Sequence, residues 1–206
     1  MLIEPLRWAA AGASVAAYGA LCAGLWWRER ERARAAAADA VALSGPGDAV
    51  LMVHASQTGQ AEAIAWDSAR WLHAGGTPVR VVALNALDAD TLRRTRRAFF
   101  VASTYGEGDA PDGASVFVER LMEVATTPTL PQLSYAVLAL GDRDYANFCG
   151  FGHRLDDWLQ ARGAQPAFPR IEVDNGAPAA LAEWRRRLRP DASEQDLAEA
   201  SPPADF

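Results

Sequence analysis

The chain has 206 residues, half of them hydrophobic, and a net charge of −6. This length suits one ordinary domain with a sizeable core and one extra segment. An acidic protein is repelled by phosphate backbones, so we exclude nucleic acid as a partner. Only two cysteines are present, Cys22 and Cys149, and they predict neither a disulfide nor a metal cluster.

The first predicted element is a hydrophobic helix within residues 1–28. The 20 residues from position 8 to position 27 carry no charge, and as a helix they span roughly 30 Å, the hydrocarbon thickness of a bilayer. Tryptophans stand at both ends, where interfacial aromatic residues prefer to lie. A cleaved signal peptide would need a small-residue cleavage site after this run, and an amphipathic surface helix would need a polar face. We therefore expect a transmembrane anchor rather than either alternative.

The charges around this helix predict its orientation. Four arginines lie between positions 28 and 34, whereas only Arg7 precedes the apolar run. Basic residues favour the cytoplasmic side, so we expect a single-pass protein of the inner (cytoplasmic) membrane with its C-terminal body in the cytoplasm. Residues 29–47 are predicted to form a charged stalk that ends in a Gly- and Pro-containing break. Residues 191–206 contain five acidic and no basic residues and are predicted to be an acidic tail or linker.

Between these segments, residues 48–190 alternate short apolar stretches with helical patterns. This alternation predicts a parallel sheet covered by helices on both faces. We expect a doubly wound α/β fold of five parallel strands that binds its ligand beyond their carboxyl ends. The predicted strands are 49–56, 78–84, 97–103, 135–140 and 171–173, and the predicted helices are 61–74, 88–94, 115–124, 152–161 and 178–188.

The loop after the first predicted strand has the composition of an anion site. Residues 56–60 read Ser-Gln-Thr-Gly-Gln and run straight into a helix. Backbone N–H groups at a helix N-terminus, aided by hydroxyl groups, bind anions. The loop has no lysine and does not match the nucleoside-triphosphate motif, so it suits a monophosphate. A plain capping turn is the alternative.

The loops after the third and fourth predicted strands carry exposed aromatic residues. Tyr105 stands beside two glycines, whose backbone freedom permits close approach to a flat ligand. Tyr145 and Phe148 lie on the fourth loop, which should reach the same edge of the sheet. Two aromatic groups on either side of a crevice form a slot for a planar ring. Each loop alone could be ordinary turn chemistry, but the three together predict a site for a planar, phosphorylated ligand.

These three loops resemble the FMN domain of the diflavin reductases, the family of cytochrome reductases and sulfite reductase flavoproteins. The SQTG-x-AE loop of that family is found at residues 56–62, the TYGEGD loop at 104–109, and the LGD…Y…F-C-x-FG loop at 140–152. The resemblance covers residues 49–188. It implies that the doubly wound domain is flavodoxin-like and binds FMN.

The resemblance also implies roles for individual residues. The phosphate of FMN would be held by residues 56–60, with Gln60 standing where the family has threonine. Tyr105 and Tyr145 would stack on opposite faces of the isoalloxazine ring. The full set of implied cofactor-binding residues is Ser56, Gln57, Thr58, Gly59, Gln60, Ala61, Ser103, Thr104, Tyr105, Gly106, Gly108, Leu140, Gly141, Asp142, Tyr145, Phe148, Cys149 and Asp174.

By the same resemblance the chain would transfer electrons through FMN. Family members carry an FAD and NADPH module after this domain, so we expect an FAD/NAD(P)H reductase module or protein as the electron donor. The acceptor, membrane-associated or soluble, is not identified by the sequence. The chain would then be a component or fragment of an NADPH-dependent diflavin oxidoreductase. The alternatives are a flavodoxin-like module that binds or signals without redox chemistry, and a flavodoxin-like quinone reductase.

Charged residues outside these motifs give two further expectations. Five acids are predicted to form a rim around the flavin edge that steers an electron partner by charge. Asp156 and Asp157 are expected on the solvated face of a helix. The predicted acidic rim comprises Glu107, Asp109, Asp112, Asp142 and Asp144.

Overall fold

The computed structural model describes residues 18–28, 30–31, 49–124 and 128–188. The chain divides into two compact units, Met1–Ala42 and Leu43–Phe206. In the first unit, residues 18–28 are helical. Among the described helices, none has the length and apolar character needed to cross a membrane. The first part of the predicted anchor, most of the predicted stalk and the whole acidic tail lie outside the described residues.

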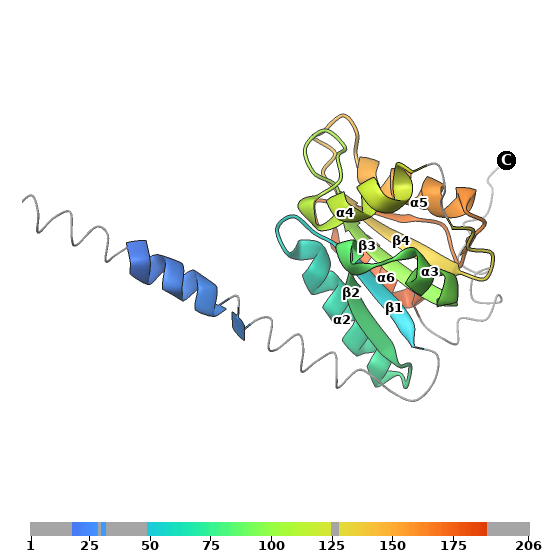
Figure 1. The fold of residues 1–206 in the computed structure, drawn as a ribbon, viewed down its shortest axis with the longest axis horizontal. Helices are drawn as coiled ribbons and strands as arrows, with labels where there is room; N and C mark the ends of the chain where they lie inside the picture. The colour runs from blue at the N-terminus through green and yellow to red at the C-terminus, as the bar shows by residue number, and fades with distance from the viewer. Residues whose placement is uncertain (1–17, 29, 32–48, 125–127, 189–206) are drawn as a thin grey trace, which may run out of the picture. The chain divides into compact units, whose positions relative to one another are not determined.

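The second unit is built on a parallel sheet (Figure 1). The strands follow the order β2-β1-β3-β4-β5, and β6 also pairs with β4. The first strand, β1, therefore lies in the interior of the sheet, and later strands extend it to both edges, as the doubly wound prediction requires. The strands are β1 (Val50–Ala55), β2 (Val79–Ala83), β3 (Arg97–Ser103), β4 (Ser134–Gly141), β5 (Gln165–Pro166) and β6 (Ile171–Asp174).

The predicted count of five strands is wrong, because two short strands occupy the edge beside β4. β5 pairs with the first two residues of β4, and β6 pairs with its last four. Pro166 and Pro169 fall at this interruption, and proline has no N–H group for a strand ladder. The two pieces share one position in the strand order, so the doubly wound arrangement is retained.

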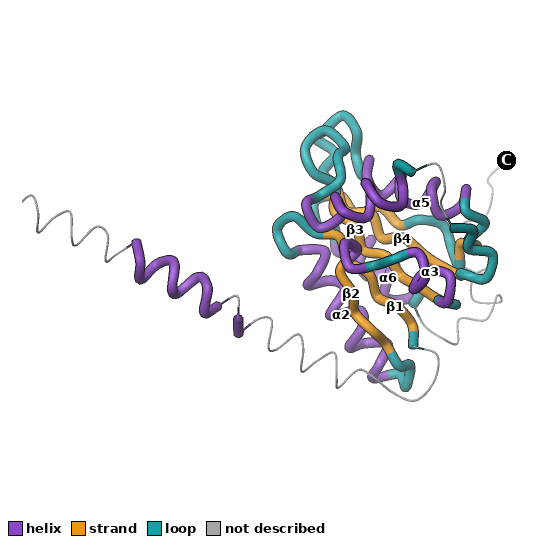
Figure 2. The backbone as a smooth tube through the Cα atoms, viewed as in Figure 1, coloured by secondary structure: helices purple, strands orange, loops and turns teal. Residues whose placement is uncertain are grey.

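Helices cover both faces of the sheet (Figures 1 and 2). Successive strand residues point to opposite faces, and in β1 Met52 packs with one helical layer while Leu51 and Val53 pack with the other. Both faces are therefore apolar. One layer contains α2 (Gln60–Ala74) and α6 (Pro178–Arg187), and the other contains α3 (Ala89–Arg94), α4 (Ser115–Phe117) and α5 (Gly150–Ala161).

The segment predicted as one helix over 115–124 is divided in the structure. Only α4 is an α-helix, and residues Val118–Met122 continue it as a π-helix. Phe117, Val118 and Leu121 are all buried in this stretch. Phe117 meets the ring of Trp158 edge-on at 5.4 Å between centroids. The tertiary contacts of these side chains, which the local sequence pattern does not contain, accompany the change in helical pitch.

Trp184 anchors α6 to the other elements of its layer. The indole is buried and donates a hydrogen bond from Nε1 to Ser68 Oγ on α2 at 3.0 Å. Its ring packs against Phe99 and Phe168, with centroids 5.9 Å and 5.8 Å away. This packing fixes α6, and with it the β6–α6 loop that reaches the candidate site.

Asp156 is buried, contrary to the expectation of a solvated pair, whereas Asp157 is exposed. One oxygen of the Asp156 carboxylate accepts a hydrogen bond from the Tyr135 hydroxyl at 2.6 Å, and the other pairs with Arg170. Burial and the nearby carboxylate raise the pKa of Tyr135, so its hydroxyl stays a donor. A buried carboxylate is tolerated here because both of its oxygens have partners.

Candidate functional site

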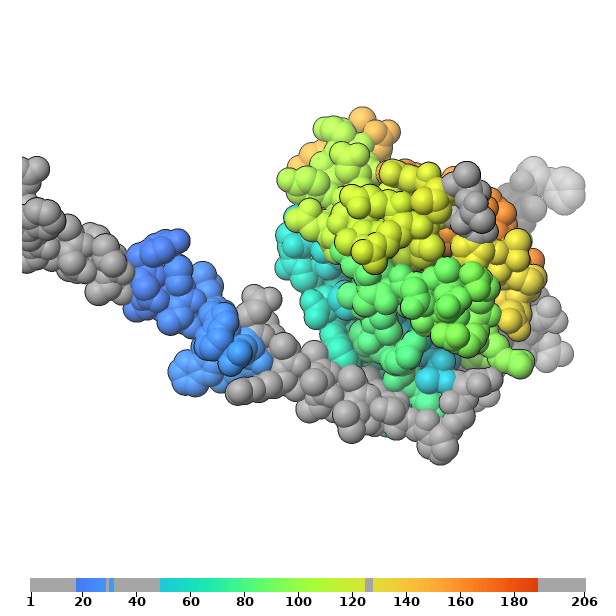
Figure 3. Space-filling view, in the orientation of Figure 1, coloured from blue at the N-terminus to red at the C-terminus, as the bar shows by residue number. Residues whose placement is uncertain are grey.

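A cavity of about 420 Å³ lies at the carboxyl ends of β1, β3 and β4. This is the edge where doubly wound sheets bind ligands. The β3–α4 and β4–α5 loops, which form much of its wall, lie side by side at one end of the domain (Figures 1 and 3). The cavity is lined by Gln57, Thr58, Gln60, Ser103, Thr104, Tyr105, Gly106, Leu140, Gly141, Asp142, Tyr145, Asn147, Phe148, Cys149 and Asn175.

The β1–α2 loop presents the start of α2 to this cavity. Gly59 is the N-cap and has a φ of 91°, a conformation that favours glycine. Its N–H donates to Ser56 Oγ at 2.8 Å, which closes the turn. No side chain caps the first turn of α2, so its leading N–H groups are free to bind an anion.

Gln57 ties this loop to the β3–α4 loop. Its Nε2 donates to Asp112 Oδ2 at 2.9 Å, and its Oε1 accepts from the Asp112 backbone N–H at 2.8 Å. An additional Cβ on the neighbouring Gly113 would lie 2.8 Å from the carbonyl oxygen of Ser56. The side chain of Gln57 thus holds two loops in register, a role beyond the predicted phosphate contact.

Tyr105 and Tyr145 line the cavity and remain 56% and 49% exposed. Both rings therefore offer apolar surface that a planar ligand could cover. The Tyr105 backbone is fixed by paired hydrogen bonds with Asp109, at 3.0 Å and 2.8 Å. Gly106 and Gly108 complete this turn with positive φ angles.

The two tyrosine-bearing loops touch each other. Asn147 Nδ2 donates to the carbonyl oxygen of Glu107 at 2.5 Å. A Cβ at Gly108 would approach Asn147 Cβ to 2.7 Å, so a larger residue there would push the loops apart. The spacing of the two tyrosines is thus set by direct packing between their loops.

The base of the cavity is formed where β4 meets the start of α5. A Cβ on Gly141 would lie 2.7 Å from the Cys149 backbone nitrogen. The Cys149 thiol donates to the Ala139 carbonyl at 3.2 Å, and burial raises its pKa to about 11. This neutral thiol is not a nucleophile. The Phe148 ring is covered by the Arg143 guanidinium, 4.7 Å from its centroid, so it serves as a wall of the cavity.

A buried hydroxyl group of the cavity, that of Thr104, is left without a hydrogen-bond partner among the described residues. Thr104 Oγ1 is buried and accepts or donates no hydrogen bond within the described part of the chain. Buried hydroxyl groups are nearly always paired, so this atom marks a position for a ligand group. Together with the uncapped helix and the two exposed rings, it gives the cavity the features that FMN requires: an anion site, polar partners and aromatic surfaces.

Most of the predicted binding residues line the cavity. Asp174 does not: its Oδ1 accepts from the Arg143 backbone N–H at 3.0 Å, and its carboxylate lies 3.5 Å from the Arg143 guanidinium. It therefore holds the β4–α5 loop from outside. Ala61 is fully buried, which leaves only its backbone for a ligand. The predicted residues that do not line the cavity are Ser56, Gly59, Ala61, Gly108 and Asp174.

Sequence reasoning missed two lining residues, Asn147 and Asn175. Asn175 adopts a φ of 43°, and its N–H donates to the Gly141 carbonyl at 2.8 Å. The Asn-Gly pair at 175–176 directly after the last strand was a visible turn signal. Asn147 lies inside the loop motif that follows the fourth predicted strand, between Tyr145 and Phe148. Only the folded loop shows its contact with Glu107.

Comparisons with known proteins agree with this geometry. The flavodoxin family model matches residues 52–187. The sulfite reductase [NADPH] flavoprotein alpha-component of Photobacterium profundum is 34% identical over 154 residues, which are 75% of this chain and 25% of that protein. The same component of Vibrio cholerae is 35% identical over 137 residues, 66% of this chain and 22% of that protein. The chain thus spans about a quarter of the length of these curated relatives.

Among solved structures, a flavodoxin from Streptococcus pneumoniae superimposes with a TM-score of 0.60 at 27% identity. The match covers 73% of this chain and 98% of that flavodoxin. The family match, the parallel sheet and the cavity at its carboxyl edge all agree. The chain therefore belongs to the flavodoxin family, and the cofactor of its domain is FMN.

Proposed function

We propose that this domain accepts electrons from an FAD/NAD(P)H reductase module or protein and passes them through FMN to a separate acceptor. The observation that carries this proposal is the pair of half-exposed tyrosines at one cavity, Tyr105 and Tyr145. A scaffold that only binds proteins has no need for a ring slot next to an uncapped helix. The similarity to sulfite reductase flavoprotein components supports a reductase as the electron source.

The residues of the cavity bind and orient the cofactor and supply no acid–base chemistry of their own. FMN, when bound, provides one- or two-electron transfer. The β1–α2 loop would hold its phosphate and the two tyrosines would position its ring, while the Gln57–Asp112 hydrogen bonds join the two loops beside it. No histidine lines the cavity in the described part of the chain, and Cys149 stays a neutral thiol.

The acidic residues around the cavity fit a partner with a basic docking face. Glu107, Asp109 and Asp144 are exposed on the two tyrosine-bearing loops. Complementary charge raises association rates, and salt screens the effect. We therefore propose that the electron partner docks over this edge of the domain.

We also propose that residues 1–28 anchor the chain in the inner membrane with the FMN domain in the cytoplasm. The uncharged run and the arginines that follow it support this orientation. Leu21, Leu25 and Trp26 are exposed on the described helix, and apolar surface of this kind suits an apolar environment. Reporter fusions at each end test the topology, and a C-terminal reporter active only in the periplasm would refute it.

The redox proposal is tested by anaerobic stopped-flow absorbance on the flavin-loaded chain. NADPH alone should leave the flavin oxidised, and addition of an FAD-carrying reductase should bleach it, faster at low salt. Rapid reduction by NADPH alone would favour the quinone-reductase alternative. A colourless protein that ignores added FMN in a fluorescence titration would favour the non-redox module.

A further inference from the structure

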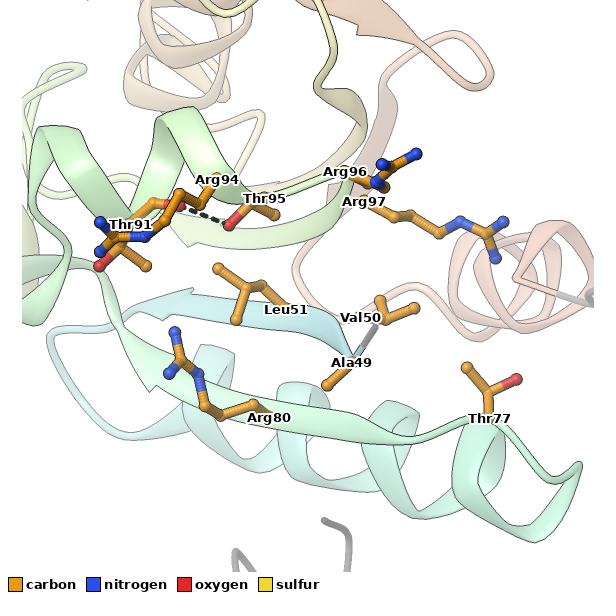
Figure 4. A pocket seen from close by; sticks show the side chains of 10 residues that line it. All are labelled: Ala49, Val50, Leu51, Thr77, Arg80, Thr91, Arg94, Thr95, Arg96 and Arg97. Carbon is orange, nitrogen blue, oxygen red and sulfur yellow. Dashed lines mark hydrogen bonds between the residues drawn. The ribbon is translucent and has the colours of Figure 1, made fainter. Parts of the chain in front are cut away.

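A second cavity, of about 560 Å³, lies at the opposite, amino edge of the sheet (Figure 4). It is framed by the starts of β1, β2 and β3 and by the end of α3. Four of its lining residues are arginines, and none is acidic. The lining consists of Ala49, Val50, Leu51, Thr77, Arg80, Thr91, Arg94, Thr95, Arg96 and Arg97.

The cavity extends around the amino ends of the strands. Arg80 pairs in register with Leu51, so both side chains point to the α3 face of the sheet. α3 has only six residues, and Arg80 rises from β2 toward the segment that carries Thr91 and Arg94 (Figure 4). Arg97 stands one position before Ala98, the register partner of Leu51, so it leaves β3 toward the other face, and the cavity reaches both arginines around the amino edge.

Part of the positive charge in this cavity has no carboxylate partner among the described residues. Arg80, Arg94 and Arg97 are exposed, and none forms an ion pair with a carboxylate of the described residues. Arg94 does interact electrostatically with Asp88, so Arg80 and Arg97 are the clearest free cations. Guanidinium groups match phosphate oxygens in geometry and form bidentate hydrogen bonds with them.

The position of the cavity in the chain indicates which phosphate it meets. Ala49, the first described residue of the domain, is part of the lining. The predicted stalk leads from the proposed membrane anchor to this residue, so the chain enters the domain at the edge that carries the arginines. Basic groups near an anionic leaflet are attracted to it.

We propose that the arginine cavity binds the head-group phosphates of anionic phospholipids. The amino edge of the sheet then faces the membrane, and the acidic flavin edge points away from it, toward soluble partners. This inference rests on the membrane attachment proposed above. It does not depend on the redox proposal, because lipid binding is measured without flavin reduction.

The test is a calorimetric titration of the full-length chain in a neutral detergent. The probes are dihexanoyl phosphatidylglycerol, dihexanoyl phosphatidylcholine and inorganic phosphate. The anionic lipid should bind, and the double substitution Arg80→Gln/Arg97→Gln should weaken it about 30-fold, or about fivefold for each arginine. The matched control, Arg120→Gln/Arg154→Gln, changes the net charge equally at exposed sites outside the cavity and should keep the affinity.

Three results would overturn the proposal. Equal losses in the two double variants would show attraction by net charge alone. Phosphatidylcholine binding as tightly as phosphatidylglycerol would remove the role of the anionic head group. Inorganic phosphate binding as tightly as the lipid would make the cavity a site for free phosphate. Retained flavin absorbance at the opposite edge verifies that each variant is folded.

Discussion

Replacing Tyr145 with alanine should weaken FMN binding without weakening the fold. The ring is 49% exposed, and a tyrosine side chain has about 200 Å² of surface, so about 100 Å² is open to a ligand. A stacked flavin covers one face, about 50 Å², which at about 25 cal/mol per Å² contributes about 1.2 kcal/mol. The dissociation constant should therefore rise about eightfold.

The same reasoning applies to Tyr105, which is 56% exposed. The dissociation constant of the double alanine variant for FMN should rise about 60-fold if the two rings act on separate faces of the flavin. Fluorescence titration of the apoprotein with FMN measures each constant, and Tyr→Phe variants are the controls because they keep the ring. An unchanged constant in Tyr145→Ala would refute the stacking role. An equal loss in the phenylalanine variant would assign the contact to the hydroxyl group.

Three further predictions address the support of the site. Gln57→Ala removes both hydrogen bonds to Asp112, so the FMN affinity measured by calorimetry should fall about tenfold. Asp112→Asn keeps an acceptor oxygen and should lose much less FMN affinity. Equal losses in the two variants would contradict the role of these hydrogen bonds. At pH 8 only about one part in a thousand of Cys149 is thiolate, because its pKa is about 11. Iodoacetamide should therefore leave Cys149 intact in the folded chain and label it in urea, as measured by mass spectrometry. Fast labelling of Cys149 in the folded chain would contradict the buried thiol. Burial lowers the pKa of His54 below its ordinary 6.5. As the pH falls, the unfolded state therefore binds a proton at this histidine before the folded state does. The free energy of unfolding should then decrease as the pH drops below 6.5. His54→Gln should remove that component in urea melts at pH 7.5 and 5.5, and an unchanged slope would refute it.

The arrangement of the sheet was predictable because its signals are local. Each parallel strand is an apolar run, and each helix start has its own pattern, as at Asp88, which caps α3 by accepting from the Thr91 N–H. The division of the last edge strand was not predicted, although Pro166 and Pro169 carried the signal. Asp156 was misplaced because its partners, Tyr135 and Arg170, come from distant parts of the chain.

The candidate site was likewise predictable only in part. The loop motifs predicted which residues gather at the cavity, because three consecutive ligand-facing loops must meet at one sheet edge. They did not predict which side chains support the loops. Gln57 and Asp112 are 55 positions apart in sequence, and Asn147 and Glu107 are 40 apart. Such pairs depend on loop geometry that no local pattern contains.

Close backbone contacts make the loops of the flavin edge a single mechanical unit. A Cβ on Gly113 would lie 2.8 Å from the Ser56 carbonyl oxygen, and one on Gly150 would lie 2.9 Å from Gly108 Cα. Each loop therefore touches its neighbour with no side chain between them, and displacement of one must move the next. The acidic rim is carried on these same loops. A partner that docks on the rim thus contacts the structure that sets the spacing of Tyr105 and Tyr145, the proposed stacking residues, which links docking to the environment of the flavin.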